Sequence, residues 1–283
     1  MAGPIARPTT HGEVVKTMTE QRILLDVDDA GVATVTLNRA DKHNALDPAM
    51  FDALLAVTGD LAADRRVRAV VVHGAGKSFC SGLDISSLGG DGLADSLLDR
   101  DDADRGNQAQ RVSLDWGHVP APVITAIHGN CFGGGLQIAL GADIRYATPD
   151  ARLSIMEVKW GLVPDMGITQ TLPRLLRADV AKELTFTGRV LSGAEAHELG
   201  LVTGTADDPL ACALDLAHQI AAKSPHAVRA AKRLYDETWT GTDPSAALLL
   251  ESTLQVELIG SPNQLEAVHA GLARREPRFT DPD

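Results

Sequence analysis

The pattern of hydrophobic and polar positions predicts strands at the start of the chain. Between residues 23 and 38, two apolar runs flank residues 28–31, whose sequence DDAG is typical of a hairpin turn. Residues 67–72 and 123–127 are short β-branched runs without polar alternation, as expected for strands buried on both faces. The chain is therefore expected to open with a hairpin and to continue into buried strands.

A helix is predicted between the hairpin and the first buried strand. Asp47 is a favourable N-cap residue, and Pro48 suits the first helical position. The apolar residues that follow recur at helical spacing: Met50, Leu54, Val57 and Leu61. The order strand, helix, strand, loop, strand, helix indicates the α/β fold class.

The last third of the chain follows a different pattern. No strand is expected from Asp208 onward, and helix starts recur at Ser224, Asp243 and Ser261, each followed by proline. Gln264 completes a capping-box pattern with Ser261. The helix that begins there carries an apolar stripe of Leu265, Val268 and Leu272.

Three regions follow from these patterns. Residues 1–20 show little apolar periodicity and are predicted to form a flexible tail. Residues 21–205 would form the α/β core, and residues 206–283 a helical region. Residues 89–111 are rich in Asp and Gly, which predicts either a mobile loop or a solvated helix. Loops of that length in compact domains often cover a site.

Composition and charge limit the partners of this protein. The chain has 283 residues, 44% of them hydrophobic, and a formal net charge of −12 at pH 7. The acidic balance argues against nucleic acid or an anionic membrane as a partner, because both require a basic surface. No apolar run is long enough to span a membrane, and residues 1–20 lack the apolar segment of a secretory signal. We therefore expect a cytoplasmic protein.

The cysteines and histidines are not spaced as in disulfide frameworks or metal sites. Cys80, Cys131 and Cys212 form neither a C-x-x-C pair nor a dense framework, which fits a reducing compartment. The histidines never fall four residues apart beside a glutamate, so no helix-borne zinc site is expected. Ser78 and Ser81 do not lie in a G-x-S-x-G motif, so no serine-hydrolase nucleophile is indicated.

Two segments carry candidate chemistry. Residues 77–85 (KSFCSGLDI) follow the first buried strand, and residues 127–137 (IHGNCFGGGLQ) lead from the second into three glycines and a helix. Both place backbone amides at strand ends, and the second also places them at a helix N-terminus, which favours an incoming negative charge. This arrangement is suited to an oxyanion hole. Close packing between helix and strand is the alternative explanation of the three glycines.

These segments have a family resemblance. Together with residues 37–46 (LNRADKHNAL), 156–167 (MEVKWGLVPDMG) and 274–279 (RREPRF), they resemble the enoyl-CoA hydratase/isomerase (crotonase) superfamily. The resemblance runs from Ile23 to Phe279. It implies the ClpP/crotonase fold, a spiral of ββα turns with a C-terminal helical region that packs in homotrimers, often stacked as hexamers.

The resemblance also assigns roles to residues. The amides of Leu83 and Gly134 would hold a thioester oxygen as it becomes an enolate, which lowers the barrier by several kcal/mol. The path of coenzyme A would be lined by Ser81, Leu83, Asp84 and Ile85. Its phosphates would need a local basic patch on this acidic protein, for which the candidates are Arg39, Lys42, Lys77 and Arg274. For each of these four, a solvated surface charge is the alternative.

The candidate catalytic residues are Glu157, Asp165 and Gln137. Hydratases of the family use two glutamates on water, but here Gln137 occupies the first position and Glu157 the second. An amide cannot accept a proton at neutral pH, so the two-carboxylate mechanism is incomplete. Asp165 matches the place where dienoyl-CoA isomerases of the family carry a second acid. Its alternative role is to cap the helix that would begin at Met166.

These features predict an enzyme that acts on an acyl-CoA thioester through an enolate, with coenzyme A as part of the substrate and with neither metal nor redox cofactor. We place double-bond isomerisation ahead of hydration. The alternatives are an enoyl-CoA hydratase in which Gln137 replaces one glutamate, and a catalytically weak acyl-CoA-binding protein. The acyl pocket is expected to involve residues 86–115 and the helical region.

Overall fold

The computed structural model describes residues 21–84, 86, 97–98, 106–239 and 241–282. Within those ranges the main sheet has six strands, in the order β1 (Ile23–Val27), β2 (Val32–Leu37), β3 (Ala69–Gly74), β4 (Val123–Ile127), β6 (Ile144–Ala147) and β9 (Gly204–Thr205). Strands β1 and β2 are antiparallel, and every later pair is parallel. The predicted hairpin is thus confirmed.

A second, smaller sheet gives the fold its spiral character. It contains β5 (Asn130–Phe132), β7 (Arg152–Ser154) and β8 (Leu191–Ser192). Strand β5 follows β4 and leads into α4 (Gly134–Leu140), while β7 follows β6, so successive turns alternate between the two sheets. The segment after β3 follows the same path, because Cys80 forms an isolated parallel bridge with Cys131 in β5. This repetition is the predicted ββα spiral.

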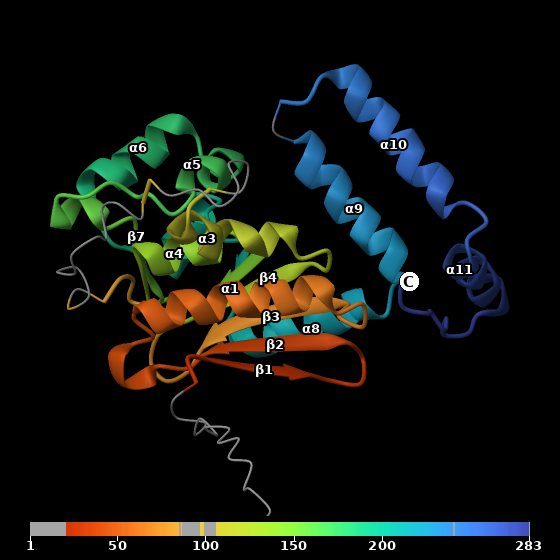
Figure 1. Ribbon diagram of the computed structural model, residues 1–283, viewed down its shortest axis with the longest axis horizontal. Coiled ribbons are helices and arrows are strands. Elements are labelled where there is room, and N and C mark those ends of the chain that lie inside the picture. Colours follow the sequence, from red (N-terminus) through yellow and green to blue (C-terminus); the bar gives the residue numbers. More distant parts are fainter. Residues whose placement is uncertain (1–20, 85, 87–96, 99–105, 240, 283) are drawn as a thin grey trace, which may run out of the picture.

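Helices cover both faces of the main sheet. Helices α1 (Pro48–Ala63) and α3 (Gln108–His118) pack together over one face (Figure 1). Helix α8 (Pro209–Ala221) covers the other face, where Ala213, Ala217 and Ala221 meet Val71 and its neighbours. Adjacent strand residues such as Val70 and Val71 therefore enter different cores, which explains why these strands lack polar alternation.

Shorter helices follow β7 and carry the chain around the site. They are η3 (Glu157–Trp160), α5 (Ile168–Thr171), η4 (Leu172–Arg174), α6 (Ala178–Thr187) and α7 (Gly193–Glu198). A short turn, η1 (Ala40–Lys42), lies between β2 and α1. Within the described ranges, no helix is both long and apolar enough to cross a membrane.

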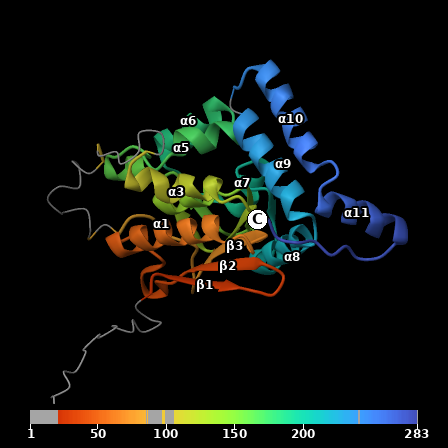
Figure 2. The same cartoon turned by 45° about the vertical axis from the view of Figure 1, so that its right-hand side comes forward.

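The last three helices form an arm that stands away from the sheets. They are α9 (Pro225–Thr238), α10 (Pro244–Leu258) and α11 (Pro262–Ala273), and α10 and α11 extend outward from α9 in both views (Figures 1 and 2). Helix α9 is joined to the rest of the protein by the ion pairs Arg174–Asp236 and Lys232–Asp143. The predicted caps are confirmed, since each N-cap side chain accepts from the amide three residues later. The Gln264 side chain, however, accepts from the Gly260 amide, one residue before the expected partner.

One strand boundary differs from its prediction, and two other predicted segments lie wholly or largely outside the described residues. The first buried strand runs over Ala69–Gly74 instead of residues 67–72, because Val32 pairs with Ala69 and the ladder begins there. In the segment 89–111, the described end is ordered as the first turn of α3, capped reciprocally by Asn107 and Gln110. The rest of that segment lies largely outside the described residues, as does the predicted tail at residues 1–20.

Candidate active site

Two backbone amides that have no acceptor among the described residues lie at the centre of the candidate site. Leu46 donates its amide to the Gly82 carbonyl at 2.8 Å, and its carbonyl accepts from Asp84 at 2.9 Å. This bridge uses the groups on either side of Leu83 and leaves the Leu83 amide without an acceptor among the described residues. Gly134 is the first residue of α4, so its amide has no intrahelical acceptor either.

The three glycines serve different purposes. Gly133 is the N-cap of α4 and has a φ of 51°, a conformation that glycine adopts without strain. A Cβ atom on Gly135 would lie 2.6 Å from the Cys80 carbonyl oxygen, so this glycine is required by packing between the two segments. A Cβ on Gly134 would lie 2.7 Å from the Met166 Sδ. The packing explanation therefore holds for Gly135, while Gly134 combines close packing with an available amide.

Asn44 holds the Leu83 segment in place, a role that the sequence analysis did not assign. Its side chain is fully buried, and Nδ2 lies 2.8 Å from the Ser78 carbonyl, with those of Ala75 and Phe79 also in reach. Its Oδ1 accepts from the Arg39 amide at 2.8 Å. Asn44 also has a φ of 56°, a left-handed conformation that asparagine tolerates better than most residues. A buried asparagine inside the resembling segment 37–46 was the available signal.

Glu157, at the start of η3, is joined to Gln137 in α4. Gln137 is 2% exposed and donates from Nε2 to Glu157 Oε1 at 2.7 Å. The Gln137 Oε1 accepts from the Met166 amide at 2.9 Å. Glu157 Oε2 is buried and has no hydrogen-bond partner among the described residues. The structure therefore places Glu157 beside Gln137, with one carboxylate oxygen hydrogen-bonded and the other without a partner among the described residues.

Burial shifts both candidate acids in the same direction. Desolvation raises the pKa of Glu157 above its ordinary value, an effect that the Gln137 hydrogen bond opposes and the charge of Asp165 reinforces. Desolvation also raises the pKa of Asp165, although that residue retains more contact with solvent than Glu157 does. Neighbouring carboxyl groups whose pKa values are raised towards the working pH are better suited to proton transfer than ordinary surface acids.

The alternative role for Asp165 is wrong. Helix α5 begins at Ile168, and its N-cap is Gly167, with no side-chain cap. A φ of 85° at Gly167 turns the chain before the helix starts, which leaves the Asp165 carboxyl outside the capping position. Asp165 therefore has no helix-capping function to explain its presence beside Glu157.

The candidate basic residues do not form one patch. The Arg39 guanidinium is largely buried and pairs with Asp84 at 2.7 Å, so it is not a solvated surface charge. It also contacts Asp47, the N-cap of α1, which pairs in turn with Arg22. Hydrogen bonds from Ser86 and Arg39 lower the pKa of the Asp84 carboxyl to about 2. This network holds Asp84, one of the residues predicted to line the coenzyme A path, in place.

The other predicted contacts to coenzyme A are dispersed. Lys42 and Lys77 are exposed near the loops that carry Leu83, and the Ser81 hydroxyl lies 3.4 Å from the Lys42 carbonyl. Ile85 lies outside the described residues. Arg274 is the C-cap of α11, and Figure 1 places α11 far from α4, the helix that begins at Gly134.

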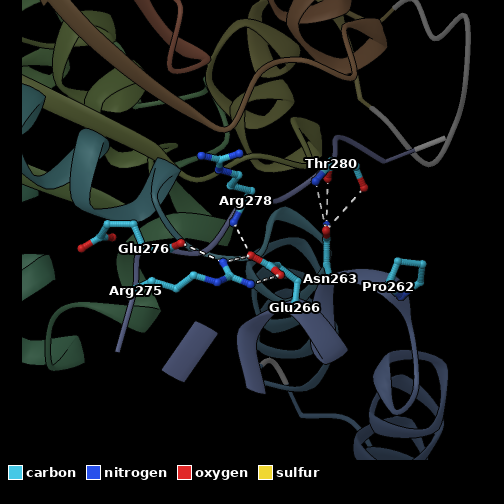
Figure 3. Close-up of a pocket in the computed structure, with 7 residues that line it drawn as sticks. All are labelled: Pro262, Asn263, Glu266, Arg275, Glu276, Arg278 and Thr280. Carbon is cyan, nitrogen blue, oxygen red and sulfur yellow. Dashed lines mark hydrogen bonds and ion pairs between the residues drawn. The ribbon is translucent and has the colours of Figure 1, made fainter. Parts of the chain in front are cut away.

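A pocket in the arm has a structural explanation. Asn263 and Thr280 bond each other through backbone and side chain, and Arg275 forms a bidentate pair with Glu266 (Figure 3). These contacts fasten the C-terminal residues to α11. The residues that line the pocket are Pro262, Asn263, Glu266, Arg275, Glu276, Arg278 and Thr280. Across the described ranges, no three His, Cys, Asp or Glu side chains gather as metal ligands would.

The fold and the site together define a class of protein: a ββα spiral in which segments 77–85 and 127–137 present amides without acceptors among the described residues, near a buried carboxyl group. A family model described as enoyl-CoA hydratase/isomerase matches residues 28–282. The chain therefore belongs to the enoyl-CoA hydratase/isomerase, or crotonase, superfamily.

Individual relatives differ in the reaction that their names state. The chain is 34% identical to the mitochondrial Delta(3,5)-Delta(2,4)-dienoyl-CoA isomerase of Mus musculus, over 87% of this chain and 78% of that protein. It is 31% identical to the mitochondrial methylglutaconyl-CoA hydratase of the same organism, over 95% and 86%. The crystal structure of an enoyl-CoA hydratase from Bacillus anthracis matches with a TM-score of 0.82 at 31% identity, over 92% of this chain and 99% of that one.

Proposed function

We propose that this protein isomerises double bonds in an acyl-CoA thioester, and that a 3,5-dienoyl-CoA is converted to the 2,4-dienoyl-CoA. The observation that carries the proposal is the engagement of Gln137. Its oxygen accepts from Met166 and its nitrogen donates to Glu157, so this side chain is fixed between two protein groups, and one N–H and one lone pair remain for water. Two mutually interacting acids, Glu157 and Asp165, remain for proton transfer.

The reaction needs one proton to leave and one to arrive. Removal of a proton from C2 of the 3,5-diene leaves an enolate whose charge is delocalised from the thioester oxygen along the conjugated chain. Delivery of a proton to C6 then produces the 2,4-diene, with one carboxyl group acting at each end. The Leu83 and Gly134 amides would stabilise the negative oxygen between the two steps. No water is consumed in this scheme.

Hydration is the second candidate, because the family includes hydratases such as the methylglutaconyl-CoA enzyme named above. In that case Glu157 would activate water with help from the remaining N–H of Gln137. A protein that binds acyl-CoA without turnover is the third. It would share the oxyanion amides and lack only effective proton transfer.

The test compares two substrates with one preparation of the full chain. A 3,5-dienoyl-CoA and crotonyl-CoA are assayed by absorbance, and binding of both is measured by calorimetry. Isomerisation faster than hydration is expected. Efficient hydration of crotonyl-CoA with no effect on the diene would overturn the isomerase proposal in favour of a hydratase. Binding of both thioesters without turnover would favour the third candidate.

A further inference from the structure

The Gln137 amide braces two segments at once. Its oxygen accepts a hydrogen bond from the Met166 N–H, which belongs to the peptide bond between Asp165 and Met166. Its nitrogen donates to the Glu157 carboxylate. The two candidate acids are the ends of one nine-residue stretch, residues 157–165, and Gln137 contacts that stretch at Glu157 and just beyond Asp165. Gln137 itself is buried in α4 and cannot turn away into solvent.

The orientation of this amide follows from its partners. The Met166 N–H is a donor, so the Gln137 oxygen must face it, and the NH2 group is left facing Glu157. That NH2 group donates a hydrogen bond to Oε1 of Glu157. The other oxygen, Oε2, is buried and has no partner among the described residues. One carboxylate oxygen is thereby anchored and the other is left available.

We propose that Gln137 is a positioning residue that sets the spacing of Glu157 and Asp165 and selects Oε2 of Glu157 as the oxygen that exchanges a proton with the substrate. This inference rests on the proposed function, in which those two groups act at opposite ends of a conjugated system. It assigns Gln137 a role that requires both a donor and an acceptor on the same side chain.

A carboxylate cannot perform this role in its ionised form. Gln137→Glu keeps the shape and keeps an oxygen for the Met166 amide, but its second oxygen would face Glu157 Oε1, where the amide nitrogen lies at 2.7 Å. Two carboxyl groups at this separation must share a proton, which raises the pKa of one of them. With the shared proton the introduced carboxyl donates to Glu157 as the amide does, and without it the two groups repel.

The test measures kcat and KM for the 3,5-dienoyl-CoA across pH for the wild type and three variants. Gln137→Glu should retain turnover within about threefold at acidic pH and lose about tenfold or more as the shared proton dissociates. Gln137→Met, which fills a similar volume without donor or acceptor, should be reduced about tenfold at every pH, mainly in kcat. Gln170→Glu adds the same charge on exposed α5 and should match the wild type.

Two results would overturn the positioning role. One is a Gln137→Met variant with the turnover and pH profile of the wild type. The other is a Gln137→Glu variant whose profile follows Gln170→Glu. Either would reduce Gln137 to a packing residue.

A substrate-free measurement separates this inference from the proposed function. Infrared titration of the carboxyl groups, with Glu157→Gln as the reference for assignment, should show the Glu157 band shifted by more than about one pH unit in Gln137→Glu relative to Gln170→Glu. If the wild type fails to isomerise the diene, the proposed function is wrong, and the titration still decides whether Gln137 controls Glu157. An unshifted band would reject the brace even in an active isomerase.

Discussion

Gly82 lies close to the amide nitrogen of Gly134. A Cβ atom on Gly82, which has a φ of 88°, would be 3.6 Å from that nitrogen and 2.7 Å from the Phe132 carbonyl oxygen. The residue before Leu83 and the first residue of α4 are therefore neighbours in space, although 52 positions separate them in the chain. This proximity brings together the Leu83 and Gly134 amides, neither of which has an acceptor among the described residues.

The first prediction concerns Gly134. Gly134→Val should reduce turnover by two or more orders of magnitude, roughly the effect of losing an oxyanion donor, because its side chain would displace Met166 and occupy the space beside the amide. Circular dichroism and thermal unfolding should still report a folded protein. Gly59→Val is the matched control, since a Cβ there meets nothing within 4 Å. A folded Gly134→Val variant with wild-type rates would show that this glycine serves packing alone.

The second prediction separates the two properties of Asn44. Asn44→Ala should lower the free energy of unfolding by about 2–4 kcal/mol, because the buried partners of the amide lose their hydrogen bonds. Asn44→Gly loses the same bonds but adopts the left-handed backbone freely, so it should be about 1 kcal/mol less destabilised than the alanine variant. Denaturant unfolding measures both. Equal stability of the two variants and the wild type would contradict the scaffold role.

The third prediction uses the pKa of Glu157. Burial raises this pKa from its ordinary value of 4.5, so the folded state holds a proton that the unfolded chain releases. Stability conferred by that proton is lost as pH rises above about 4.5 towards the folded pKa. Glu157→Gln removes the titration, so its melting temperature relative to the wild type should increase over this range. It should also abolish turnover, and an active Glu157→Gln enzyme would refute the whole site assignment.

The fourth prediction concerns Asp165. Asp165→Asn should reduce isomerisation of the 3,5-dienoyl-CoA by roughly two or more orders of magnitude, as expected for removal of a general acid or base. Its stability should change little, because Gly167 and not Asp165 is the N-cap of α5. Stopped-flow absorbance and thermal unfolding test the two parts. Unaltered isomerisation would restrict proton transfer to Glu157.

The fifth prediction is that the protein is a trimer or a hexamer. Large apolar side chains are exposed along α9 and α10, including Trp239 at 72%, Leu249 at 69% and Val256 at 71%. Leu265, Val268 and Leu272 of α11 add the predicted apolar stripe, which is also exposed. Such surfaces are typical of interfaces. Light scattering at micromolar concentration should give three or six times the chain mass, and a monomeric mass would contradict the prediction.

Much of the local structure could be predicted from the sequence. The hairpin, the helix start at Asp47 and strand β4 follow from short-range patterns, because turn chemistry, capping and β-branched runs act over a few residues. The three glycines of residues 127–137 were visible for the same reason, whereas Gln137 was recognised as a departure only through the family resemblance. Local patterns did not predict where β3 begins, because its first residue is set by pairing with β2 and not by its own composition.

The sequence by itself determined which chemical groups this protein has: two amide-bearing glycine segments, two acids and an amide in place of a third. Only the tertiary structure decided what those groups contact. Gln137 meets partners 20 and 29 residues away, and Arg39 pairs with Asp84 instead of facing solvent. Arg274 caps α11, a helix that lies far from α4. Side-chain partners of this kind depend on how distant strands and helices pack, and no local pattern in the chain encodes that packing.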